Sequence, residues 1–250
     1  RLLIHAGAQS RSALALTWTG DAEAAFLSNA VGEIHVEDGA RIDALEIQRQ
    51  PAAVHHVWNL GVRVGRDATF SSCCVQLGAK LARNDMGVRL DAEGAACRFD
   101  GVTFLGRRQH VDIQTNVDHA LPHCESHQLF KSVLEDHAQV AFAGKVLVRP
   151  DAQKTNATQA NHNLLLSPDA VCDSVPMLEI FADDVKCAHG ATVGQLDPEA
   201  LFYLRARGIG LADATQILVR AFADEVPERI DHEALAAHAK AALASYFDRS

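Results

Sequence analysis

The chain has 250 residues, of which 48% are hydrophobic, and it carries a formal net charge of −9. This length is enough to bury one large core or two small ones, and so acidic a surface excludes nucleic acid and anionic membranes as favoured partners. The sequence contains no apolar run of the roughly 20 residues that a membrane-spanning helix needs. It begins at Arg1 rather than at a methionine, and no signal peptide is visible at its start.

Six cysteines are spread along the chain, without a Cys-x-x-Cys motif or the spacing of a disulfide framework. In a chain with a large core, this pattern predicts reduced thiols and therefore a cytoplasmic location. We interpret four of the six as small buried side chains, namely Cys73, Cys74, Cys97 and Cys172. The other two, Cys124 and Cys187, lie close to histidines and are considered with them below.

Residues 1–193 contain a long series of short apolar alternations, each broken by Gly, Asp or Asn. The clearest is 111–118, where Val, Ile and Thr alternate with Asp, Gln and Asn. A small turn that ends in alanine also recurs, and its copies at 38–40, 66–68 and 93–95 are spaced 28 and 27 residues apart. Later copies follow at closer spacing, the last of them at 189–191. Such a period predicts a solenoid whose coils stack to bury one continuous apolar column.

We therefore expect a mainly β fold, a right-handed parallel β-helix over 1–193. Each coil would hold two or three short strands joined by tight corners, with small residues where the chain turns inward. The alternative is an antiparallel sandwich, which would favour hairpin turns such as Asn-Gly between paired strands. No such turn is found in the sequence, so we prefer the parallel β-helix.

From Leu196 the pattern becomes helical and predicts a small α-helical C-terminal domain over 194–250. Asp197-Pro198-Glu199 is a helix start, with a cap, a proline at the first helical position and an acid in the first turn. It predicts a helix over 198–207 that ends at Gly208. The apolar spacing between 214 and 222 predicts a second, amphipathic helix, interrupted at Pro227. A third helix follows, with Asp231 as its cap. The helical region as a whole would lie against the end of the solenoid or present an apolar face to another protein.

Cys187 and His189 are the strongest candidates for chemistry. They follow a predicted strand that ends before Asp183, and residues two apart in an extended segment project on the same side. A thiolate and an imidazole on one edge can hold a soft metal or an iron–sulfur species. Their spacing alone also fits a solenoid corner with one residue buried and one solvated.

Two other polar segments deserve the same comparison. The first combines His119, His123, Cys124 and His127, but its spacing matches no standard zinc pattern, so we interpret it as a polar corner and leave metal binding open. The second, 154–163, is rich in Asn and Gln and could be a substrate groove, although a stacked polar corner is the simpler interpretation.

No nucleotide-binding or nucleophile-elbow motif is present, so any ATP hydrolysis must be done by a partner.

A long resemblance covers residues 100–225. The segment LEIFADDVKCAHGATVGQLDPEALFYLRARGI resembles the C-terminal signature of the SufD branch of the SufB/SufD family, scaffolds of iron–sulfur cluster assembly. HALPHCESHQLFKSVL, FAGKVLVRPDAQKTNATQANHNLLLS and SVPMLEI match as well. Chains of this type usually carry a further N-terminal helical region, so the resemblance favours a fragment of a longer protein.

The resemblance implies a β-helix, a helical region and a non-enzymatic scaffold subunit of the Suf complex. It implies pairing with a SufB-like scaffold and a SufC-like ATPase. In the absence of these partners, the chain could form a homodimer. Cys187 and His189 would then contribute to a cluster-assembly site completed by the partner chain, holding iron or an iron–sulfur cluster transiently, with nothing bound by the chain alone. The ATPase would dock on apolar helix residues, for which the candidates are Leu201, Leu204, Ile217, Leu218 and Phe222.

The competing interpretation is a carbohydrate-active parallel β-helix enzyme, a lyase or hydrolase. Such an enzyme needs clustered carboxylates, with basic and aromatic side chains along one solenoid face. Aromatic residues make up only 6% of the chain and its acids are scattered. We therefore prefer the scaffold, while the cluster type and the sources of iron and electrons stay open.

Overall fold

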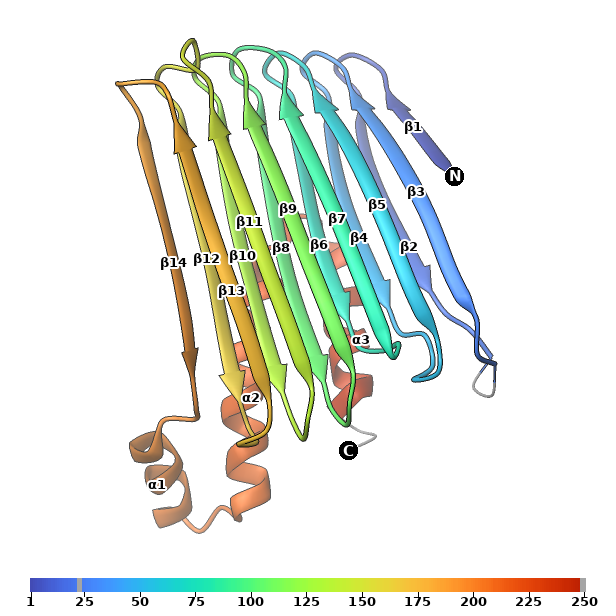
Figure 1. Ribbon diagram of the computed structural model, residues 1–250, viewed down its shortest axis with the longest axis vertical. Coiled ribbons are helices and arrows are strands. Elements are labelled where there is room, and N and C mark those ends of the chain that lie inside the picture. The colour runs from blue at the N-terminus through green and yellow to red at the C-terminus, as the bar shows by residue number, and fades with distance from the viewer. Residues whose placement is uncertain (22–23, 248–250) are drawn as a thin grey trace.

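The computed structural model describes residues 1–21 and 24–247, and within them it contains two parallel seven-stranded sheets followed by three helices (Figure 1). Consecutive strands alternate between the sheets, so each pair of strands makes one coil. The odd-numbered sheet contains β1 (Leu2–Ala6), β3 (Leu27–Val36), β5 (His55–Val64), β7 (Leu81–Leu90), β9 (His110–His119), β11 (Gln139–Val148) and β13 (Val171–Ile180). The even-numbered sheet contains β2 (Arg11–Trp18), β4 (Arg41–Gln48), β6 (Thr69–Gln76), β8 (Ala96–Leu105), β10 (Glu125–Leu134), β12 (Asn156–Leu165) and β14 (Lys186–Gly194).

This arrangement confirms the predicted parallel β-solenoid. From β3 on, each strand pairs in parallel with the strand one coil earlier, as β11 does with β9, where Val140 lies opposite Val111. Because the register is kept from coil to coil, like residues stack on one another and the inner side chains form continuous rows. The inner space is filled by apolar side chains from both sheets, including the ring pairs Phe70–Phe99 and Phe130–Phe142 at centroid distances of 5.8 and 5.1 Å.

The recurring alanine has a structural reason. Ala40, Ala68 and Ala138 follow tight corners and are buried, because the chain turns inward there and only a small side chain fits. The corners themselves use left-handed backbone, at Gly39 (φ 65°) and even at Asp67 (φ 50°). One copy of the repeat is wrong, since 189–191 lies inside β14 and not in a turn.

The three helices are α1 (Pro198–Ala206), α2 (Leu211–Glu228) and α3 (Glu233–Phe247). The predicted start of α1 is confirmed, because the Asp197 side chain accepts a hydrogen bond from the Glu199 backbone N–H at 2.9 Å. Pro227 does not interrupt the second helix but lies in its last turn, so α2 continues to Glu228. None of the described helices is both long enough and apolar enough to cross a membrane.

Helices α2 and α3 pack along the outer face of the even-numbered sheet and not on the end of the solenoid (Figure 1). This placement corrects the first of our two alternatives, in which the helical region would lie against the end of the solenoid. It also explains why β8 and β10 are buried on both faces, unlike a strand with one solvated side. The second apolar core so formed includes Leu45, Val75, Phe104, Leu129 and Val133 from the sheet, and Val219, Val226, Leu235, Ala239 and Leu243 from the helices.

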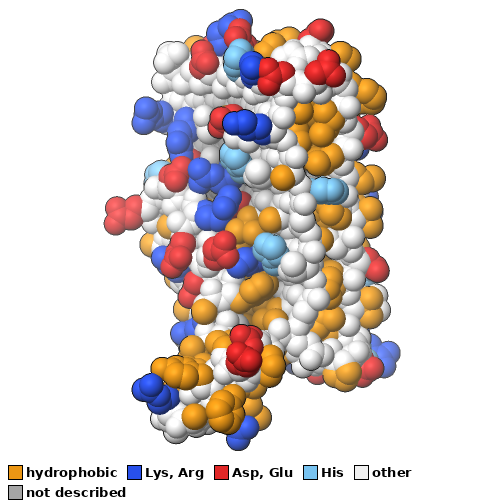
Figure 2. Space-filling view, turned by 90° about the vertical axis from the view of Figure 1, so that its left-hand side faces the viewer, with side chains coloured by type: hydrophobic (Ala, Val, Ile, Leu, Met, Phe, Trp, Pro, Cys, Tyr) orange, Lys and Arg blue, Asp and Glu red, His pale blue; other side chains and the backbone are white. Residues whose placement is uncertain are grey.

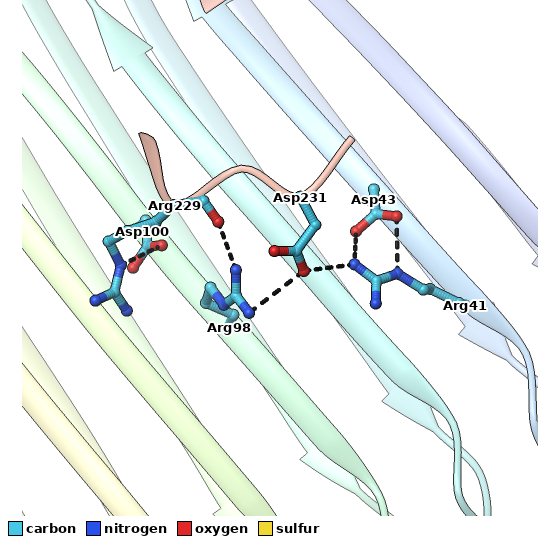
Figure 3. Close-up of polar contacts among 6 residues, drawn as sticks. All are labelled: Arg41, Asp43, Arg98, Asp100, Arg229 and Asp231. Atoms are coloured by element: carbon cyan, nitrogen blue, oxygen red, sulfur yellow. Dashed lines mark hydrogen bonds and ion pairs between the residues drawn. The ribbon is translucent and has the colours of Figure 1, made fainter. Parts of the chain in front are cut away.

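Charged groups fix the turn between α2 and α3 to the sheet (Figure 3). The Asp231 carboxylate, predicted to cap α3, accepts hydrogen bonds from Arg41 at 2.7 Å and from Arg98 at 3.4 Å. Arg98 also donates to the backbone carbonyl of Arg229 at 2.5 Å. The turn is therefore held by ion pairs to strands β4 and β8 in addition to the apolar core.

Candidate functional site

The solenoid ends with an uncovered coil made by β13 and β14, each the last strand of its sheet (Figure 1). Cys187 of β14 is in register with the buried Ala157 of β12, and His189 is in register with the buried Gln159. Both side chains therefore project toward the solenoid interior, on the side where no further coil covers them. The expectation that they share one side of an extended segment agrees with this geometry.

The two residues differ in their surroundings. Cys187 is half-buried and packs against the inner apolar core, whereas His189 is exposed. Burial raises the pKa of the Cys187 thiol, so the isolated chain favours its protonated form. Since a thiolate is the metal ligand, binding of a cation by Cys187 would require release of that proton.

Within 1–21 and 24–247, no three His, Cys, Asp or Glu side chains are grouped so that they could hold a metal ion. Cys187 and His189 are thus two donors on an open surface and not a closed site. A tetrahedral metal centre needs four ligands, so the remaining donors would have to come from outside the described residues.

The uncovered coil also carries apolar side chains and unpaired strand edges. Figure 2 views the molecule from this end, with hydrophobic side chains running along the exposed coil and gathering again over α1 and α2. Unpaired edges present rows of backbone N–H and C=O groups and are templates for pairing with another chain. The exposed apolar residues of this end are Val171, Val175, Met177, Ile180, Phe181 and Val193.

The histidine-rich segment does not converge on one point. His119 is buried inside the solenoid, with Nε2 at 2.8 Å from Ser126 Oγ, and burial lowers its pKa to about 4. His123 lies on a corner with φ 59°, and His127 projects outward to Thr158 Oγ1 at 2.7 Å. Cys124 is buried at the same corner, where its thiol donates to a backbone carbonyl, so these four side chains have separate structural roles.

Residues 154–163 form strand β12 for most of their length, which corrects our assignment of a corner. Its inner-facing residues include Asn161, whose Oδ1 accepts hydrogen bonds from Asn163 Nδ2 at 2.7 Å and from Ser174 Oγ at 2.8 Å. The polar side chains thus bond across the interior of the last coils.

A second surface lies between α1 and α2, where a groove of about 840 Å³ is lined by Leu204, Ile217 and Leu218. Helix α1 has no buried residue, and Phe202 is 74% exposed. Three of the five residues predicted to bind a partner therefore line this groove. The other two, Leu201 and Phe222, are half-buried, and the Phe222 ring lies 4.4 Å from the Lys131 ammonium group.

Sequence reasoning missed the two aromatic residues of this groove, Phe202 and Tyr203. Apolar residues at helical spacing in this segment select Leu201 and Leu204. Phe202 and Tyr203 could have been found because they lie next to Leu201 and Leu204 in the sequence. Two large aromatic side chains on the other face of a short helix are unusual for a surface that contacts only solvent.

Residues 1–222 match the SufBD core domain of the SUF system for FeS cluster assembly. The chain belongs to this family. It is 37% identical over 205 residues to an iron–sulfur cluster assembly SufBD family protein of Synechocystis sp., covering 82% of this chain and 45% of that protein.

Two further relatives agree. The iron–sulfur cluster assembly protein SufD of Escherichia coli is 35% identical over 202 residues, covering 81% of this chain and 48% of that protein. Protein ABCI7, chloroplastic, of Arabidopsis thaliana is 32% identical over 210 residues, covering 84% of this chain and 44% of that protein. The chain spans about half the length of these curated relatives. Membership of the SufBD family favours cluster assembly over the carbohydrate-active alternative, which the solenoid fold alone could not exclude.

Proposed function

We propose that this SufBD-family chain is a non-enzymatic, cytoplasmic scaffold subunit of an iron–sulfur cluster assembly complex. It would pair with a SufB-like scaffold and a SufC-like ATPase. The observation that carries the proposal is the pairing of Cys187 and His189 on the inner side of a coil that nothing in the described chain covers. Iron or a cluster would be cargo at this interface and not a resident cofactor.

The chemistry of the two donors suits iron. An imidazole nitrogen and a thiolate are both good ligands for it, and thiolate is the usual ligand of iron–sulfur clusters. A cation beside Cys187 would stabilise the thiolate and offset the burial that raises the thiol pKa. Two donors hold a cluster weakly, so we infer that a partner subunit supplies the others and that assembly takes place only in the complex.

The edges of β13 and β14 are the proposed contact for the second scaffold. A partner strand there would satisfy the open backbone groups and cover apolar side chains such as Val175 and Val193. The same contact would place the partner's donors above Cys187 and His189. A second copy of this chain could use the same edge in isolation, which is how we interpret the predicted homodimer.

The groove between α1 and α2 is the proposed dock for the ATPase. Its exposed side chains, among them Phe202 and Ile217, resemble the anchors of helix-in-groove recognition. Helix α1 makes its main contacts with α2 and not with the solenoid, so a partner could bind there without disturbing the sheets.

Co-purification tests the proposal. We expect the chain to form a complex with a SufB-like and a SufC-like protein, and Val175→Glu in β13 to release the scaffold but keep the ATPase. The matched control is Val57→Glu, on the outer face of β5 away from both proposed contacts. A chain that binds neither partner, or loses both through Val175→Glu, would contradict this assignment of surfaces.

A further inference from the structure

Gln159, in the middle of β12, has a buried amide without a hydrogen-bond partner. Its side chain faces the solenoid interior and is 2% exposed. Neither Oε1 nor Nε2 bonds to any residue in the described part of the chain. A buried amide in this state is destabilising compared with an apolar side chain of similar size, so its presence calls for a hydrogen-bond partner within reach.

The position of this amide in the inner rows points to that partner. In register order the row reads Phe99 in β8, Gln128 in β10, Gln159 in β12 and His189 in β14. Neighbouring strands lie about 4.8 Å apart, so Gln159 is directly beneath His189. Deeper in the solenoid this row contains Ser72 and the Phe99 ring, and from β10 to the open end each of its members is polar.

The other inner strand leaves room for the amide. A Cβ atom added at Gly144 of β11 would lie 2.2 Å from Gln159 Nε2, so the missing side chain of this glycine accommodates the amide group. The His189 ring, for its part, makes no hydrogen bond with the described residues and is exposed. Exposed side chains change rotamer on picosecond to nanosecond timescales, so the ring is free to turn toward the amide.

We propose that Gln159 is the positioning residue of His189. Its amide oxygen accepts a hydrogen bond from one imidazole nitrogen and thereby directs the lone pair of the other nitrogen out of the open end, toward incoming iron. Metal-binding histidines typically donate their second ring N–H to a carbonyl or carboxylate, which fixes the tautomer and the ring orientation. The inference rests on the proposed role of His189 as an iron ligand and adds the residue that orients it.

Gln128 provides a matched control. It occupies the same row, one strand further from His189, and is equally buried. Its Oε1 already accepts a hydrogen bond from Thr115 Oγ1 at 2.8 Å. A substitution there disturbs the polar interior in a similar way, but Gln128 lies too far from the imidazole to accept a hydrogen bond from its N–H group.

The first test is the tautomer of His189, measured by nitrogen NMR on the full chain with labelled histidine at a pH where the ring is neutral. The His189 signals are assigned by comparison with His189→Asn. We expect one dominant tautomer in the unmodified chain and in Gln128→Leu, and a mixture like that of free imidazole in Gln159→Leu. Gln159→Glu, which keeps an acceptor, should restore the single tautomer. An unchanged tautomer in Gln159→Leu, or the same change in Gln128→Leu, would overturn the proposal.

The second test is cluster formation by the complex reconstituted with the partner subunits. Loss of an outer hydrogen-bond partner typically costs about tenfold or more in metal affinity or activity, so Gln159→Leu should slow cluster formation about tenfold while Gln159→Glu and Gln128→Leu stay near the unmodified rate. His189→Ala is measured beside them. If His189→Ala abolishes cluster formation but Gln159→Leu does not slow it, the proposed function stands and the positioning role is refuted. If His189→Ala has no effect, the proposed function itself fails.

Discussion

Arg229, at the end of α2, donates a hydrogen bond from Nε to Oδ2 of Asp100, a buried carboxylate in β8, at 2.9 Å (Figure 3). Burial raises the pKa of Asp100, and the guanidinium of Arg229 opposes that rise. The ion pair therefore joins the helical region to the solenoid and also keeps a buried acid charged. Breaking such a pair from one side is costly, because the other charge stays buried without a partner.

We predict that Arg229→Met lowers the free energy of unfolding by about 3 kcal/mol, since it leaves the Asp100 carboxylate unpaired. The double variant Arg229→Met with Asp100→Leu should recover most of this loss, because no charge remains buried. Urea unfolding followed by circular dichroism measures both. If the double variant is as unstable as the single one, the destabilisation comes from lost packing of the arginine stem and not from the ion pair.

A second prediction concerns pH. Glu46 of β4 is buried beside Trp18, whose Nε1 donates to Glu46 Oε1 at 3.1 Å, and burial raises its pKa from an ordinary value of 4.5 to about 7. Below the ordinary value this side chain is protonated in both the folded and the unfolded chain, so its ionisation does not change the free energy of unfolding. As the pH rises toward 7, the unfolded chain releases its proton first, so the folded chain loses stability until both forms are ionised.

Glu46→Gln cannot ionise, and it should therefore gain stability relative to the unmodified chain as the pH rises from about 5 to about 8, by up to about 3 kcal/mol. Urea unfolding at a series of pH values, followed by the fluorescence of Trp18 and Trp58, gives the difference directly. The centroids of the two Trp rings are 5.2 Å apart, and Trp18 is hydrogen-bonded to Glu46, so their fluorescence reports on unfolding around this side chain. A constant difference between the two proteins across this range would show that Glu46 titrates normally.

The third prediction separates partner binding from folding. Phe202→Glu and Ile217→Glu place a charge in the groove between α1 and α2, and each should weaken ATPase binding by about 2 kcal/mol or more, roughly thirtyfold in Kd. Neither residue belongs to the cores of the solenoid, so thermal unfolding should be unchanged. Leu211→Glu is the control, because Leu211 is exposed on α2 but does not line the groove. Equal weakening by the control would place the dock elsewhere on the helices.

The sequence predicted the solenoid because the inner column depends on local alternation and on the alanine at several of the corners, both of which are visible without a structure. It predicted α1 because Asp197 and Pro198 determine a helix start locally. It did not predict where α2 and α3 pack, since that depends on outward apolar residues such as Phe104 and Leu129, and a strand buried on both faces resembles any other apolar run. The sequence also did not predict the polar inner row of Gln128, Gln159 and His189, for a related reason.

Gln159 illustrates this last limit. Alternation identifies an inner face only where that face is apolar, and in β12 polar side chains occupy both faces. The segment therefore seemed to be a corner, although its register with β10 and β14 places Gln159 deep in the interior. Cys187 and His189 could be selected from their spacing together with the family resemblance, but their place on an uncovered coil follows only from the order of the strands.

The most direct test of the proposed function is cluster formation by the reconstituted complex that carries His189→Ala. Because the imidazole is exposed, its removal should leave folding and complex formation intact while the yield of cluster falls to about a tenth or less. Cys187→Ser should give a similar or milder defect, and His55→Ala, an exposed histidine on the outer face of β5, should give none. An unchanged yield from an intact complex carrying His189→Ala would contradict the proposed role of the open end of the solenoid.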